Sequence, residues 1–328
     1  MSLRIIKNGL LDTIQDEGRY GYQHLGINPG GAMDSIAMRV ANMLVGNDQG
    51  EAVIEMHFPA AEIFFEQSAL IALSGADFSA MINTHPVPLN KPLLVQEGSV
   101  LRFTKNISEC RVYLSIQGGF VADEWLASCS THLKVKAGGF AGRALQRYDR
   151  ILLKQNSTHV FVNEEEAYRI LPWQANITDL YTMGNFHFTP GAEYEYLDEL
   201  SKAHLEAGVF IISKQSDRMG YRLEGPPIQL TTPMELISTA VTKGTIQLLP
   251  DGQLIVLMAD HQTTGGYPRV AHVISADISS VTQTGVGQKI IFIQTHSSTA
   301  ENMLLQQQRN LQQLQNACTF RLQEYFNQ

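Results

Sequence analysis

The sequence has few charged residues and no long apolar run, and each shortage excludes a class of protein. Charged residues make up 17% of the 328 residues, against roughly 25% in an average protein. The formal net charge is −8 and no Lys/Arg cluster offsets it, which argues against a nucleic-acid partner. No apolar run reaches roughly 18 residues and no signal-peptide pattern opens the chain, so we expect no membrane span and no secretion.

Cysteines are scarce as well. Cys110, Cys129 and Cys318 are far apart in the sequence, without the spacing of a disulfide framework or a zinc site. This usage predicts a reducing, cytoplasmic location. The ten histidines are scattered, and no pair has the spacing of metal ligands, so no metal is predicted.

Several catalytic motifs are missing. The glycine cluster at 138–142 lacks the pattern and the lysine of a phosphate-binding P-loop. No Gly-x-Ser-x-Gly nucleophile elbow occurs, and no Met-Lys-Met sequence is present for biotin attachment. ATP or biotin chemistry would therefore involve a site shared with, or supplied by, another protein.

The pattern that is present favours a mainly β protein. A chain of this length indicates two domains, and its short β-branched and aromatic runs are bounded by turn residues, as in barrels or sandwiches. One helix is predicted from about Asp34 to Leu44, ending at Gly46-Asn47. A second occupies the last 30 or so residues, with a capping-box pattern at Ser298 and Glu301; it either closes its own domain or contacts a partner. The clearest predicted strands are 69–73, 111–116, 209–212, 254–258 and 289–293.

Two segments of the chain resemble each other. Arg19, Gly21 and Tyr22 recur at one constant offset as Arg218, Gly220 and Tyr221. We interpret this as an internal duplication, with domains at 1–175 and 176–328 and a connector at 156–179, although chance could produce so few identities. Similar domains create a cleft that their equivalent loops can face. There Arg19 and Arg218 would bind a carboxylate or phosphate, or else each would fasten its own loop by binding backbone carbonyls.

The segment from Asp260 to Pro268 is the strongest candidate for a binding loop. It follows the apolar run 254–258 and supplies a carboxylate, two hydroxyls, two glycines and a tyrosine. Glycines let backbone N–H groups approach a ligand closely, and polar loops that follow rigid strands commonly form sites. The alternative is a tight turn with capping hydroxyls. His261 is a candidate base beside Asp260.

Taken together, the motifs of the chain resemble those of the 5-oxoprolinase C-subunit family, also described as biotin-dependent carboxyltransferase, allophanate hydrolase subunit 2 or KipA-like. The resemblance runs almost from end to end. Two segments depart from the family pattern: 127–131 reads Ala-Ser-Cys-Ser-Thr where the family has Gly-Ser-Arg-Ser-Thr, so Cys129 replaces an arginine, and Tyr148 replaces a glycine before Asp149. These changes weaken any anion-binding role for that region. The matching segments are 9–21, 30–34, 41–47, 52–55, 73–76, 111–114, 117–119, 130–131, 138–143, 216–223, 244–247, 250–253 and 260–268.

The resemblance implies two cyclophilin-like β-barrel domains with a few helices. It also implies that the chain functions in a complex with the B-type (KipI-like) and A-type subunits of 5-oxoprolinase. In that complex, ATP drives opening of the 5-oxoproline lactam to glutamate. Two alternatives follow from the same family. One is the carboxyltransferase component of a biotin-dependent, urea carboxylase-like system, and the other is a KipA-like regulator that binds a kinase-inhibitor protein.

Lactam opening and carboxyl transfer share a carbonyl oxygen that gains negative charge, which N–H donors and arginines stabilise. We therefore predict that Arg218 or Arg222 acts on that oxygen with the loop backbone, and that Asp260 orients the loop or accepts a proton. Glutamine side chains suit the edges of an amide because they donate and accept, although Gln247 could equally be a strand partner. The predicted substrate-binding residues are Gln15, Arg19, Asp34, Gln247, Gln253, Thr263, Thr264, Gly265, Gly266 and Tyr267.

Overall fold

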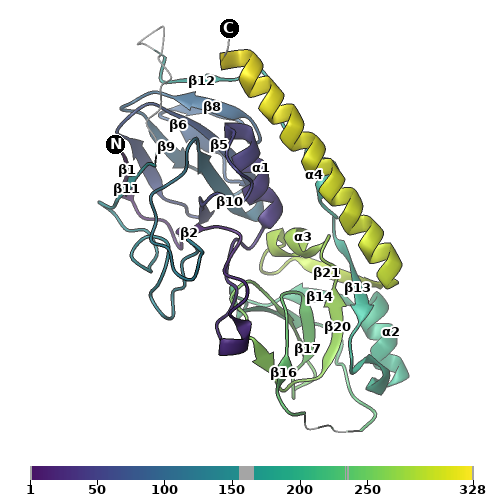
Figure 1. Ribbon diagram of the computed structural model, residues 1–328. Helices are drawn as coiled ribbons and strands as arrows, with labels where there is room; N and C mark the ends of the chain where they lie inside the picture. The colour runs from purple at the N-terminus through teal and green to yellow at the C-terminus, as the bar shows by residue number, and fades with distance from the viewer. Residues whose placement is uncertain (1, 155–165, 233, 235, 327–328) are drawn as a thin grey trace. The chain divides into compact units, whose positions relative to one another are not determined.

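The computed structural model describes residues 2–154, 166–232, 234 and 236–326, and the chain divides into two compact units. The first unit contains 1–19, 34–177 and 310–328, and the second contains 20–33 and 178–309. The division at 177–178 lies near the expected boundary at 175–176. Residues 20–33 belong to the second unit, however, and the end of the C-terminal helix belongs to the first. Of the expected connector, 156–165 lies outside the described residues. Figure 1 shows the elements of both units.

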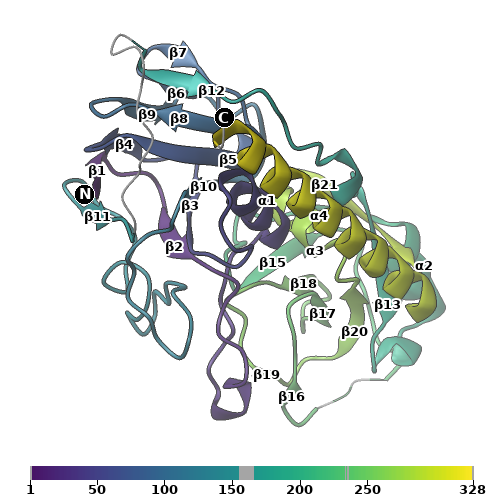
Figure 2. The same cartoon turned by 45° about the horizontal axis from the view of Figure 1, so that its top comes forward.

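The first unit contains two six-stranded sheets around one apolar core. Its strand β5 (Ala69–Asp77) is buried along almost its whole length, as its continuous apolar sequence predicts. Helix α1 (Ser35–Val45) packs on β5 and β10 (Ser108–Ile116), as Figure 2 shows. The first sheet has the order β11 (Arg150–Leu152), β1 (Ser2–Lys7), β4 (Glu62–Phe65), β9 (Val100–Phe103), β6 (Ala80–Ile82), β7 (His85–Pro86). The second has the order β12 (Tyr168–Ile170), β8 (Pro92–Val95), β5, β10 (Ser108–Ile116), β3 (Val53–His57), β2 (Thr13–Gln15).

The second unit is built on a closed barrel of seven strands. Parallel pairing of the first and last strands, β13 (Asn185–Pro190) and β21 (Lys289–Gln294), closes the ring. Phe188 and Phe292 meet edge to face inside it, 6.4 Å between ring centroids, a contact worth about 0.5–1.5 kcal/mol beyond its buried area. A short ribbon of β16 (Thr239–Ala240) and β19 (Thr264–Gly265) lies outside the ring. The barrel order is β13 (Asn185–Pro190), β20 (Arg269–Val273), β17 (Thr245–Leu248), β18 (Leu254–Leu257), β15 (Gly220–Glu224), β14 (Val209–Ile212), β21 (Lys289–Gln294).

The helices are few, as a mainly β fold requires. Asp34 caps α1 and Gly46 ends it in the left-handed conformation, so the predicted first helix is confirmed within a residue. The long helix α4 (Ser297–Phe326) is also confirmed, but it begins before Ser298. Ser298 therefore lies in the first turn and cannot be the N-cap of the expected capping box. The remaining helical segments are α2 (Glu199–Ala207), α3 (Ile278–Gln283), η1 (Gln23–Leu25), η2 (Thr178–Leu180) and η3 (Tyr194–Tyr196).

The contacts of α4 explain its division between the units. Gln307 donates two hydrogen bonds from its amide, to the carbonyls of Leu180 and Ala276 in the second unit. Farther along, Cys318 and Leu322 are buried, and Leu322 lies close to Gly46 of the first unit. The expectation that the helix simply closes the second domain is therefore corrected, because its apolar stripe continues past the residues that serve that unit.

Candidate functional site

Arg218 and Asp260 form an ion pair at one end of the barrel. Arg218 precedes β15 and Asp260 follows β18, and these strands are antiparallel partners, so strand pairing brings the two residues together. The Arg218 Nε lies 2.9 Å from Asp260 Oδ2, and the Arg218 Nη2 lies 3.2 Å from Asp260 Oδ1. The arginine side chain is only 7% exposed. A two-point, largely buried pair of this kind fixes the geometry of both loops.

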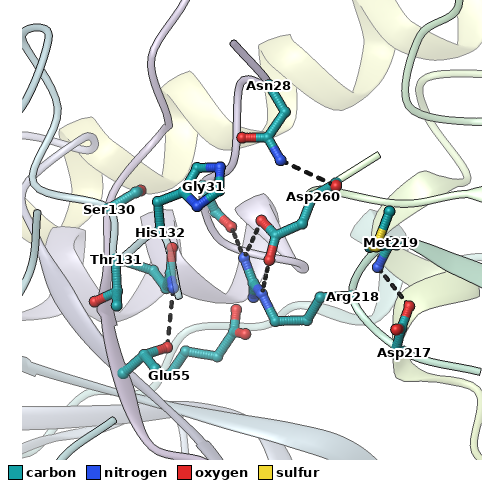
Figure 3. A network of polar contacts seen from close by, with 12 residues as sticks. Asn28, Gly31, Glu55, Ser130, Thr131, His132, Asp217, Arg218, Met219 and Asp260 are labelled. Atoms are coloured by element: carbon teal, nitrogen blue, oxygen red, sulfur yellow. Dashed lines mark hydrogen bonds and ion pairs between the residues drawn. The ribbon is translucent and has the colours of Figure 1, made fainter. Parts of the chain in front are cut away.

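The same pair holds the segment 20–33 in place. The Arg218 Nη2 donates to the Gly31 carbonyl at 2.7 Å, and the Asn28 side chain donates to the Asp260 carbonyl at 3.0 Å; Figure 3 shows both contacts. Gly30 and Gly31 have φ angles of 64° and 91°, a region that favours glycine. These bonds support the alternative role, in which Arg218 fastens a loop through a backbone carbonyl.

A cavity of about 760 Å³ and two smaller ones adjoin the loops of the second unit. One of about 650 Å³ lies between the segment 20–30 and the loop after β18, and we call it the His261 cavity. It contains a lysine, two histidines and three threonines among apolar and glycine residues, the usual make-up of a small-molecule site. Its lining residues are Tyr20, Gln23, His24, Gly26, Pro29, Gly30, Ala240, Val241, Thr242, Lys243, Ala259, His261, Thr263 and Thr264.

His261 is placed in this cavity with one ring nitrogen fixed. Its Nδ1 lies 2.5 Å from the Gln262 carbonyl, and because a carbonyl only accepts, Nδ1 carries the hydrogen and Nε2 is left as an acceptor. The residue is 2% exposed. Burial, and to a lesser degree the charge of Lys243, lowers the pKa of His261 below its ordinary value of 6.5. A neutral imidazole with a lone pair on Nε2 is equipped to accept a proton.

Lys243 supplies the positive charge of the His261 cavity. Its Nζ donates to the carbonyls of Ala32 and Met33, at 3.2 and 2.8 Å, so the cation is held at the base of the segment 20–33. Neither Lys243 nor Asn28 was predicted from the sequence. Lys243 lies in a turn without any motif, and its role depends on the fold of a segment more than 200 positions away.

The predicted binding loop is divided among different surroundings. Thr263 and Thr264 line the His261 cavity, whereas Gly266 and Tyr267 line the cavity of about 760 Å³. Gly265 pairs with Thr239 in the short ribbon. A side chain at Gly265 would place its Cβ 2.6 Å from Gln247 Nε2. Gly265 therefore packs against the end of the Gln247 side chain, and its φ is not left-handed.

Arg222 and Gln247 lie apart from the His261 cavity. Both line a third cavity of about 380 Å³ on the outer wall of the barrel, together with Tyr267. The Gln247 side chain donates to the Tyr267 carbonyl at 3.3 Å, which agrees with its alternative role as a structural partner. Gln253 lies in the turn between β17 and β18. Its backbone N–H donates to Asp251 Oδ1 at 3.1 Å within that turn. Gln253 lines none of the three cavities.

Three predicted binding residues belong to the first unit. Asp34 is buried as the N-cap of α1, bonding the N–H groups of Ile36 and Ala37 at 3.0 Å each. Arg19 is buried, donates to the Ser130 carbonyl and stacks on Trp125, with its guanidinium carbon 4.9 Å from the ring centroid. Gln15 is buried and bonds Thr13 at 2.9 Å. These contacts fit structural roles for all three.

The described residues contain neither a metal-binding cluster nor a membrane span. No group of three or more His, Cys, Asp or Glu side chains among them is arranged to hold a metal ion. None of the described helices combines the length and apolarity needed to cross a bilayer.

The two β-rich units and the loops around the barrel define a carboxyltransferase-type fold. The family described as "Carboxyltransferase domain, subdomain A and B" matches residues 25–294, and the chain belongs to this family. It is 36% identical over 312 residues to the C subunit of 5-oxoprolinase from Escherichia coli (strain K12), covering 95% of this chain and 97% of that protein. The corresponding Haemophilus influenzae protein is 35% identical over 280 residues, covering 85% of this chain and 87% of that protein.

Among solved structures, the urea amidolyase of K. lactis matches with a TM-score of 0.84 and 25% identity. That match covers 95% of this chain but only 20% of the larger enzyme. The architecture of this chain therefore corresponds to a small part of that larger enzyme.

Proposed function

We propose that this chain is the C-type subunit of an ATP-dependent 5-oxoprolinase, which hydrolyses the 5-oxoproline lactam to glutamate. The observation that supports this most is the match to the C subunit of the E. coli 5-oxoprolinase, which extends over 97% of that protein. Similarity to urea amidolyase covers only a fifth of that enzyme. A chain that matches a separate subunit over nearly its whole length is better explained as such a subunit.

The proposal includes partners. A protein named as the C component of an enzyme belongs to an assembly with other components, and we propose that the partners of this chain are a B-type (KipI-like) and an A-type subunit. Because the sequence contains no P-loop, ATP would be bound through the complex. Its hydrolysis would drive the opening of the lactam.

We assign the reacting amide to the His261 cavity. In the hydrolysis, a water oxygen adds to the lactam carbonyl carbon, the C–N bond breaks, and the water proton passes to the leaving nitrogen. The Nε2 of His261 is the acceptor that takes the proton from the water and returns it to that nitrogen. The positive charge of Lys243 favours the negative charge on the carbonyl oxygen, and the hydroxyls of Thr263 and Thr264 orient the ring.

Arg218 and Asp260 act behind the cavity in this proposal. Their ion pair positions the loop that contains His261 and, through Gly31 and Asn28, the facing segment. Neither residue lines the cavity. They are therefore proposed as positioning residues, and the oxyanion role predicted for Arg218 is transferred to Lys243.

Reconstitution tests the function. The purified chain is mixed with the partner subunits, ATP and 5-oxoproline, and glutamate is assayed. We expect glutamate formation only when this chain, both partners and ATP are all present. Glutamate formation that is equally fast without this chain would contradict the proposal.

A carboxyltransferase function is the second candidate. Two findings favour it: the match to the carboxyltransferase family and the TM-score of 0.84 to urea amidolyase. It requires a biotinylated carrier protein as the carboxyl donor. Transfer of labelled carboxyl from carboxybiotin to urea by this chain, without glutamate formation in the first assay, would support this alternative instead.

A further inference from the structure

The cavity on the outer wall of the barrel is separate from the His261 cavity. Its floor is a row across three neighbouring strands, since Arg222 pairs with Ile255 and Ile255 pairs with Gln247. The residues that alternate with these three point into the barrel core, so the row faces outward. With about 380 Å³, the cavity lies at the small end of the range for ligand sites.

Arg222 gives this cavity a cation without a protein counter-ion. Among the described residues, its guanidinium has no hydrogen-bond or ion-pair partner; the contacts of Arg222 are made by its backbone, with Ser213 and Ser216. Arg269 on the same barrel differs, because it forms a two-point pair with Glu193. A planar guanidinium on a cavity wall is suited to a carboxylate.

Asp251 gives the same cavity an anion. Its Oδ1 accepts the Gln253 N–H at 3.1 Å within the turn. No ion pair within 4.0 Å joins it to Arg222 in the described structure. Two opposite charges that line one small cavity without neutralising each other complement a ligand that carries both signs.

Two glutamines complete the recognition surface. Gln247 is fully buried, and its amide makes only long bonds, 3.3 Å to the Tyr267 carbonyl and 3.4 Å from Gln262 Nε2. Typical bonds of this type are near 2.9–3.0 Å. Long bonds are readily replaced by those of a ligand, and amides both donate and accept.

We propose that this cavity binds a free amino acid with an amide or carboxylate side chain. Arg222 receives its α-carboxylate, Asp251 receives its α-ammonium group, and the amide of Gln262 binds the side chain, while the buried Gln247 accepts a hydrogen bond from Gln262 and orients it. The proposed lactam hydrolysis is not part of this proposal. Binding can be tested separately, because it is measured on the isolated full chain without ATP or other subunits.

Calorimetric titration with L-glutamine tests the proposal. We expect binding to the unmodified chain and a loss of roughly 10- to 100-fold in Arg222→Gln, as for a hydrogen-bonded charge. L-Glutaminamide, which lacks the carboxylate, and N-acetyl-L-glutamine, which lacks the ammonium group, should bind more weakly to the unmodified chain. The matched control is Arg309→Gln on the exposed face of α4, which should bind L-glutamine normally.

Asp251→Asn gives a second, independent result, because this exposed turn residue can change without disturbing the barrel. It should weaken L-glutamine but leave N-acetyl-L-glutamine unaffected. Absence of binding heat through the millimolar range would overturn the proposal, and so would an affinity for L-glutamine that neither variant changes.

Discussion

At the scale of single residues, His261 shows how burial prepares a group for chemistry. Its Nδ1 is committed to the Gln262 carbonyl, and burial lowers the pKa of the ring. The neutral form that a base requires is therefore present at neutral pH and somewhat below it. The sequence places His261 beside Asp260, but it does not reveal which ring nitrogen is fixed.

The stability of the chain should depend on pH through this residue. Because the folded-state pKa of His261 lies below 6.5, the unfolded chain takes up the proton first as the pH falls. The contribution of His261 to stability is therefore full above about pH 6.5 and decreases as the pH falls from there toward its folded-state pKa. Urea unfolding between about pH 5 and 8 should show a steeper acid decrease for the unmodified chain than for His261→Gln. The pKa of His272 is lowered as well, so the variant keeps part of the slope, whereas identical slopes would contradict this role of His261.

Glycines illustrate what residue-level reasoning can miss. The pair Gly265-Gly266 suggested close approach of a ligand, whereas Gly265 packs against the end of the Gln247 side chain. Arg218 similarly suggested a ligand-binding fork, and its observed bonds go to Asp260 and Gly31. In both cases the partner lies on another element of the fold, and local sequence does not specify which elements meet.

At the scale of elements, the regular parts were predictable from periodicity. The runs 254–258 and 289–293 became β18 and β21, and the helical spacing after Asp34 became α1. The short ribbon of β16 and β19 was not predicted, because each strand has only two residues and pairing over such a length leaves no pattern. That ribbon contains Thr264, which lines the His261 cavity, and Gly265, which does not.

The cap of α1 yields an element-scale prediction. Asp34 satisfies two N–H groups at the start of the helix while fully buried. Asp34→Ala should lower the free energy of unfolding by about 0.5–2 kcal/mol, whereas Asp34→Ser, which retains a capping oxygen, should lower it less. Chemical denaturation measures both. If Asp34 instead bound substrate, the serine variant would lose turnover in the reconstituted complex while keeping its stability.

At the scale of the whole molecule, the presence of two β-rich units was predictable. Which segments of the chain belong to each unit was not. Residues 20–33 join the second unit because Arg218 and Lys243 bind the carbonyls of Gly31, Ala32 and Met33. These bonds join residues that are between 187 and 211 positions apart in the sequence. A domain boundary drawn from composition cannot anticipate that residues 20–33 belong to the second unit. The candidate site depends on this segment, since residues 20–30 form one wall of the His261 cavity.

The most direct measurement of the central claim is the turnover of the reconstituted complex that contains His261→Gln. We predict that kcat for glutamate formation falls by roughly 10²- to 10⁴-fold, the usual contribution of a general base, while the subunits still assemble. His296→Gln, at an exposed histidine before α4, should keep the kcat of the unmodified chain. An unchanged kcat in a fully assembled His261→Gln complex would contradict the assignment of the reaction to this cavity.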